Sequence, residues 1–105
     1  MTLEQAKQMC ESFMRHHGVY DYKFEFLQRR KKYNRAGQCD YKRKVISLQP
    51  TFVEKNYPVV IKWTILHEIA HAIAGRKHGH NKFWKRTAIA LGDDGQRCYG
   101  NYVKK

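Results

Sequence analysis

Hydrophobic residues recur at three- and four-residue steps over residues 2–17, with charged residues between them, and this spacing predicts an amphipathic helix. Thr2 and Gln5 stand three positions apart at its start, as in a capping box, where each side chain bonds the other residue's backbone. Gly18 is a suitable residue to end the helix. The first element is therefore expected to be a helix with one apolar face.

An alternating pattern follows. Tyr22, Phe24 and Phe26 alternate with Lys and Glu, which predicts a half-buried strand. Residues 38–49 form a second extended segment, and residues 34–37 between the two supply turn-forming side chains. We expect the two strands to pair as an antiparallel hairpin.

The second half of the chain reads as helical. Residues 51–55 allow one short helical turn, and residues 58–74 predict a longer helix with Pro at its first position and Gly75 after its end. A last helix is expected over residues 81–91. The order helix, hairpin, helix, helix predicts an α+β fold with a small antiparallel sheet packed on helices.

Composition limits the class of protein. The chain has 105 residues, of which 42% are hydrophobic, so we expect one domain, over residues 1–105, with a modest core. It carries 21 Lys and Arg against 9 Asp and Glu, a formal charge of +12, which favours an anionic partner. No apolar run approaches the roughly 20 residues that span a membrane, and no secretory signal is evident.

The cysteines indicate a reducing compartment. Cys10, Cys39 and Cys98 are odd in number and widely spaced, so a disulfide framework is not expected. They form no C-x-x-C pair for a thiolate zinc site, and core or inert thiols are the simplest interpretation. We expect a cytoplasmic protein, with association with the nucleoid or other DNA open.

The chemistry is concentrated in residues 67–71, which read H-E-x-x-H. Residues four apart stack on one helix face, so His67 and His71 can reach one metal ion. Glu68 is rotated by about 100°, within reach of a water on the metal without being a ligand. This is the arrangement of zinc hydrolases, in which the metal acidifies water and the Glu takes its proton.

Buried helical histidines often do no more than satisfy hydrogen bonds, and that alternative has to be weighed. Here the pair lies mid-helix, roughly opposite an apolar stripe that would pack on the core, and further histidines follow. These observations together favour a metal site facing a cleft. The stripe consists of Ile61, Ile65, Ile69 and Ile73.

A third ligand is needed, because catalytic zinc usually keeps three protein ligands. The metzincin spacing is not met, since Ala74 and Lys77 stand where that pattern needs Gly and His. No acidic residue follows Glu68 on the next predicted helix. The residues themselves leave His78 and His80 as alternatives.

Residues 67–72 followed by 79–85 resemble the SprT-like zinc metalloproteases, the Spartan-related family. That family shows H-E-x-x-H, a variable spacer and then H-x-x-x-(W/F), and His80 with Trp84 matches the second part. The resemblance covers roughly residues 37–91.

The resemblance implies one Zn²⁺ ion held by His67, His71 and His80, with Glu68 as general base. It also implies a single zincin-like domain, of minimal gluzincin-like form, with the helix over residues 58–74 central. Many relatives carry a further cysteine zinc ribbon after this core, but only Cys98 remains here, so no separate C-terminal zinc ribbon is expected. The expected activity is that of a zinc-dependent endopeptidase.

Basic residues group in two stretches, one at the expected hairpin tip and its flanks and one beside the expected metal site. Such groups bind phosphates, and a solvated basic surface is the plainer alternative. We favour contact with DNA, single- or double-stranded. The candidate contacts are Arg29, Arg30, Lys31, Lys32, Arg35, Lys42, Arg43, Lys82, Lys85 and Arg86.

The remaining assignments follow from this interpretation. Protein substrates on or near DNA are expected, and an edge near residues 45–48 could hold them as an added strand. The alternatives are a non-catalytic zinc-containing DNA-binding protein and a peptidase whose charge serves acidic substrates. A monomer is expected. The candidate oxyanion-stabilising donors are His78, Arg97, Tyr99 and Tyr102.

Overall fold

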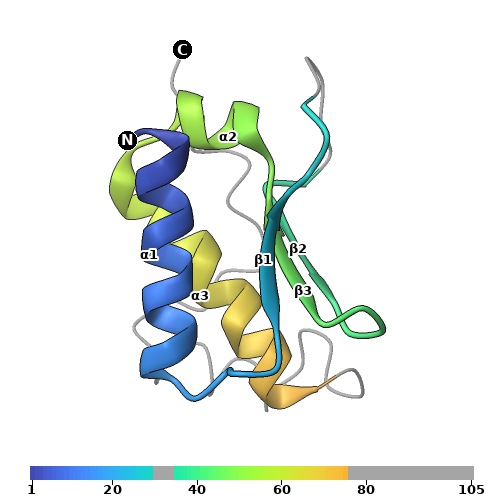
Figure 1. Cartoon of the computed structure of the whole chain (residues 1–105). Helices are drawn as coiled ribbons and strands as arrows, with labels where there is room; N and C mark the ends of the chain where they lie inside the picture. Colours follow the sequence, from blue (N-terminus) through green and yellow to red (C-terminus); the bar gives the residue numbers. More distant parts are fainter. Residues whose placement is uncertain (30–34, 76–105) are drawn as a thin grey trace.

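The computed structural model describes residues 1–29 and 35–75. They form an α+β arrangement in which a three-stranded sheet lies on one side and the helices on the other (Figure 1). The helix predicted over residues 81–91 lies outside the described residues. The elements in chain order are α1 (Leu3–His16), β1 (Lys23–Phe26), β2 (Gly37–Asp40), β3 (Val45–Leu48), α2 (Pro50–Lys55) and α3 (Pro58–Ala74).

The sheet is mixed, with strand order β1-β3-β2, and not the small antiparallel sheet that the sequence predicted. β1 pairs in parallel with β3, with Lys23 opposite Val45. β2 pairs antiparallel with β3, with Asp40 opposite Val45. The hairpin therefore joins β2 to β3, and the predicted hairpin between β1 and the following strand is wrong.

The turn that makes this hairpin covers residues 41–44, inside the segment predicted as one continuous strand. A carboxylate oxygen of Asp40 accepts hydrogen bonds from the backbone N–H groups of Lys42 (3.1 Å) and Arg43 (3.0 Å). Lys44 then adopts a positive φ of 57°. A short polar side chain that accepts hydrogen bonds from the next backbone N–H groups is known to start a turn. Asp40 does this here, in a turn that contains no glycine.

The first helix has the start that its sequence predicted. The Thr2 hydroxyl accepts the Gln5 N–H at 3.0 Å, and the Gln5 side chain accepts the Thr2 N–H at 2.9 Å, which completes the capping box. The apolar face of α1 buries three residues, Ala6, Cys10 and Met14.

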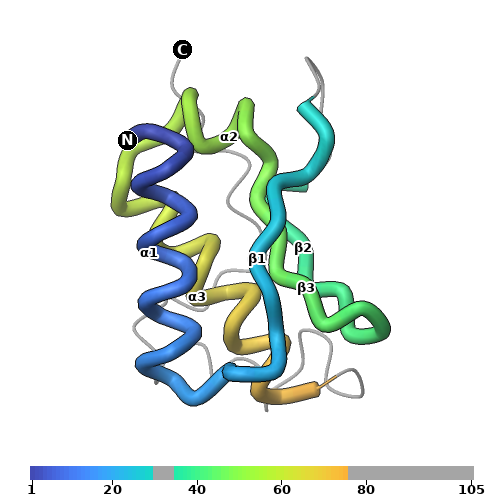
Figure 2. Tube along the Cα trace, viewed as in Figure 1, coloured from blue at the N-terminus to red at the C-terminus, as the bar shows by residue number. Residues whose placement is uncertain are grey.

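The core lies between the sheet and the helices. All four residues of β3 are buried, and β3 is the central strand of the sheet. α1 and α3 pack against each other, and α3 also packs against β2 and β3 (Figure 2). Phe52 on α2 is fully buried in the same cluster. This packing fixes the position of α3 relative to β2.

α3 begins at Pro58 and ends where Gly75 adopts a φ of 88°, as the sequence predicted. Its middle is covered on every side, because residues 64–71 are all buried. Of the predicted isoleucine stripe, Ile73 is 45% exposed and so does not join the core. Among the residues that the structure describes, no helix is long and apolar enough to cross a membrane.

Candidate metal centre

The site is built on the buried middle of α3. The ring centroids of His67 and His71 lie 4.9 Å apart, because residues four apart on a helix stack on one face. One possible ligand atom each from His67, Glu68 and His71 can be chosen so that all three lie within 4.8 Å of one another. The three side chains thus bring two imidazole nitrogens and a carboxylate oxygen together, and they could hold a metal ion.

These polar groups lie inside the protein. His67, Glu68 and His71 are 6%, 7% and 8% exposed. Burial of ionisable groups is costly, so such positions are kept where a bound ion or a reaction needs them. The protein covers most of the histidine pair, and the cleft expected on this face of α3 stays a prediction.

Tyr41 is a neighbour of this group that the sequence analysis did not single out. Its ring meets the His71 ring edge to face, with centroids 6.5 Å apart and an interplanar angle of 88°. Its position directly after β2 is the signal that could have found it, since β2 packs on α3.

Cys39 also lies within electrostatic reach of Glu68. Burial, and next the Glu68 carboxylate, raise the pKa of the Cys39 thiol to about 12, against the opposing effect of a hydrogen bond with Tyr22. Burial likewise raises the pKa of Cys10 to about 12. Both thiols are free and stay protonated at neutral pH, in line with the expectation of inert thiols. Cys98 lies outside the described residues.

The remaining candidates for ligation and oxyanion binding cannot be placed on this structure. Both possible third ligands, His78 and His80, lie outside the described residues, as do Arg97, Tyr99 and Tyr102. Their assignment stays a prediction.

The basic residues within 1–29 and 35–75 that were expected at one hairpin tip lie at two ends of the sheet. Because β1 and β3 are parallel, Arg29 follows the end of β1 while Lys42 and Arg43 lie near its start, about one four-residue strand (~13 Å) away. Arg35 precedes β2 and lies at the same end as Arg29. The other candidates, which lie outside the described residues, are Arg30, Lys31, Lys32, Lys82, Lys85 and Arg86.

Two of these cations already have acidic partners. Both terminal guanidinium nitrogens of Arg29 contact the Glu54 carboxylate. The Arg43 guanidinium pairs with the Glu25 carboxylate at 3.1 Å. Arg35 donates to the Gln38 side chain at 3.3 Å. Ion pairing reduces the charge that these arginines can offer to a phosphate.

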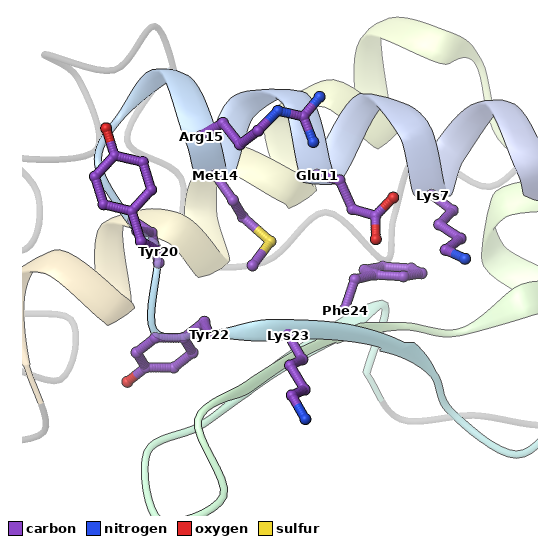
Figure 3. Close-up of a pocket in the computed structure, with 9 residues that line it drawn as sticks. Lys7, Glu11, Met14, Arg15, Tyr20, Tyr22, Lys23 and Phe24 are labelled. Atoms are coloured by element: carbon purple, nitrogen blue, oxygen red, sulfur yellow. The ribbon is translucent and has the colours of Figure 1, made fainter.

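A hollow of about 400 Å³ lies between α1 and β1 (Figure 3). Lys7, Glu11 and Arg15 line it from α1 and Lys23 and Phe24 from β1, with the Phe24 side chain directed towards α1 and that of Lys23 away from it. Neither histidine of the α3 pair lines it. The hollow is therefore separate from the candidate metal centre.

Comparison with known families decides the affiliation. The model of the SprT-like family matches residues 3–101 of the 105-residue chain. The chain belongs to the SprT-like family. This confirms the resemblance seen in the sequence, and membership of the SprT-like family indicates a metallopeptidase-type function. No curated protein and no solved structure matches the chain.

Proposed function

We propose that this SprT-like protein is a zinc-dependent endopeptidase with a zincin-like catalytic arrangement. The observation that supports it most is the meeting of His67, Glu68 and His71 ligand atoms within 4.8 Å on one buried helix of a SprT-like chain. A structural zinc site has no need of a carboxylate beside two histidines, so Glu68 favours an enzyme over a non-catalytic zinc protein.

The donor set fits zinc. Imidazole nitrogens suit Zn²⁺, and three protein ligands leave a position open for reaction. His67 and His71 would hold the ion with His80 as third ligand, and His78 is the alternative. When bound, Zn²⁺ supplies Lewis-acid activation of water and of the scissile carbonyl.

Glu68 acts as general base and then as general acid. Its carboxylate takes a proton from the attacking water and delivers that proton to the nitrogen of the amide bond that breaks. Glu68 is only 7% exposed, so proton transfer there is shielded from bulk water.

β2 is the strand best placed to hold an extended substrate. The expected platform at residues 45–48 is wrong, because β3 is the central strand and is paired on both sides. The Ala36 carbonyl accepts the Gln49 N–H at 2.8 Å, so by alternation the backbone groups of Gly37 and Cys39 point away from β3. We infer that a peptide adds along this outer edge, beside α3.

We propose that the substrates are proteins on or near DNA and that the protein acts as a monomer in the cytoplasm or at the nucleoid. The net charge of +12 supports contact with DNA, single- or double-stranded. Arg29 and Arg43 form exposed ion pairs with acidic residues, which reduces the charge that they offer to a phosphate.

The decisive experiment measures zinc content and cleavage of an unfolded protein, alone and with single- or double-stranded DNA. Glu68→Gln is the matched variant, since it keeps the shape and removes the base. We expect both proteins to bind one zinc ion per chain, with cleavage by the variant at least about 100-fold slower. Stoichiometric zinc without cleavage by the wild type under any condition would refute the proposal and leave the non-catalytic zinc protein.

A further inference from the structure

Gly37 is the first residue of β2, and its backbone lies directly against the Glu68 side chain. A Cβ atom built on Gly37 would lie 2.9 Å from the Ser47 carbonyl oxygen and 3.3 Å from Cγ of Glu68. It would also lie 3.3 Å from Cδ2 of Leu48. Gly37 is not among the residues with positive φ, so it is needed for space and not for an unusual backbone conformation.

The three atoms around that space differ in how far they can move. The Ser47 carbonyl belongs to β3, which is held by strands on both sides. Leu48 is fully buried in the core, where close packing leaves it little freedom. The closest contact is with the Ser47 carbonyl, and Cγ of Glu68, which belongs to a side chain, would also have to give by a few tenths of an ångström. This Cγ carries the carboxylate, and any displacement moves the reactive group.

We propose that Gly37 is a positioning residue for Glu68. The missing side chain lets β2 approach α3 closely, and the backbone of Gly37 then forms one wall against the Glu68 methylene groups. This assignment rests on the proposed role of Glu68 as general base. By this contact Gly37 touches neither a metal ligand nor a reacting atom, and it acts on the reaction through Glu68, while its backbone groups stay on the edge proposed to hold the peptide.

The first test is kinetic and uses the full chain with its zinc. Gly37→Ala is compared with Gln38→Ala, a change on the next residue of β2, whose side chain lies on the other face of the strand. We expect Gly37→Ala to lower kcat by about 10- to 100-fold with KM within about twofold and zinc content unchanged. The Gln38→Ala control should retain near wild-type kcat. Equal activity in the two variants, or a loss confined to KM or zinc content, would overturn the proposal.

The second test does not use activity. Urea unfolding of the metal-free protein is measured for wild type, Gly37→Ala, Glu68→Ala and the double variant. If the added Cβ presses on Glu68, Gly37→Ala destabilises less once Cγ of Glu68 is gone, so the two changes are not additive. Additive effects would show that the clash does not involve Glu68 and would overturn the proposal.

The two tests also separate this inference from the proposed function. Wild-type protein that cleaves nothing would remove the function, while a coupled unfolding cycle would still establish the Gly37–Glu68 contact. If Gly37→Ala alone fails to fold and the double variant folds, the contact is supported. If neither folds, the Ser47 clash dominates and the proposal falls.

Discussion

Tyr41 packs its ring edge to face against His71, so a residue from the turn after β2 helps to hold a candidate metal ligand on α3. The sheet is thereby tied to the site at a second point, in addition to the contact between Gly37 and Glu68. Orientation of a ligand ring by its neighbours contributes to metal affinity.

The first prediction concerns this contact. Tyr41→Ala should weaken zinc binding about 2- to 12-fold, the range that corresponds to an aromatic contact of about 0.5–1.5 kcal/mol. Tyr41→Phe keeps the ring and should bind zinc as wild type does. Competition with a chromophoric chelator measures both affinities. Equal weakening in the two variants would mean that the hydroxyl, and not the ring, carries the effect.

The second prediction identifies the third ligand. His80→Ala should weaken zinc binding by more than about 100-fold, since loss of a residue that only orients a ligand already costs roughly 10- to 100-fold. His78→Ala should leave the affinity within a few-fold of wild type. Zinc titration of both variants is sufficient. Loss of zinc in the His78 variant alone would reverse the assignment.

The third prediction is a loss of stability at high pH from Cys10. Burial, with Glu11 and Glu68 nearby, raises its pKa from 9.0 to about 12. The folded state therefore favours the protonated thiol, and its contribution is complete below pH 9 and is lost as the pH rises from 9 towards 12. Urea unfolding should show this loss. Cys10→Ala removes the titrating group. Between neutral pH and about pH 10.5, the free energy of unfolding of this variant should fall by about 2 kcal/mol less than that of wild type. Parallel pH profiles would contradict the prediction.

The fourth prediction separates two adjacent cations on the turn between β2 and β3. Arg43 is paired with Glu25, whereas the Lys42 ammonium has no ion pair with another described residue. If this turn contacts DNA, Lys42→Ala should reduce the slope of log affinity against log salt by about one, and Arg43→Ala by less. Binding is measured by fluorescence anisotropy over a salt series. An unchanged slope in both variants would exclude the turn from the DNA interface.

The helices could be predicted because their signals are local. Thr2 and Gln5 form the predicted cap, and Gly75 ends α3 where the sequence indicated. The pairing of His67 with His71 follows from the same helical period, which is why the core of the site could be read from the spacing alone.

The sheet could not be predicted in the same way. Gly37 was assigned to a turn because glycine is common there, but it begins a strand and is needed for its small size next to Glu68. The true turn has no glycine and depends on Asp40, whose hydrogen bonds take over that role. The contacts of Gly37 and Tyr41 with α3 arise from residues far apart in sequence, which no local period reports.

The parallel pairing of β1 with β3 has a consequence for the order of folding. β2 and β3 are joined by a four-residue turn and can pair early, because closing a short loop costs little entropy. Lys23 and Val45 are separated by a much longer stretch of chain, so β1 is expected to join the sheet late. The β2–β3 hairpin, which carries Gly37 and supports Glu68, could then assemble on α3 before the sheet is complete.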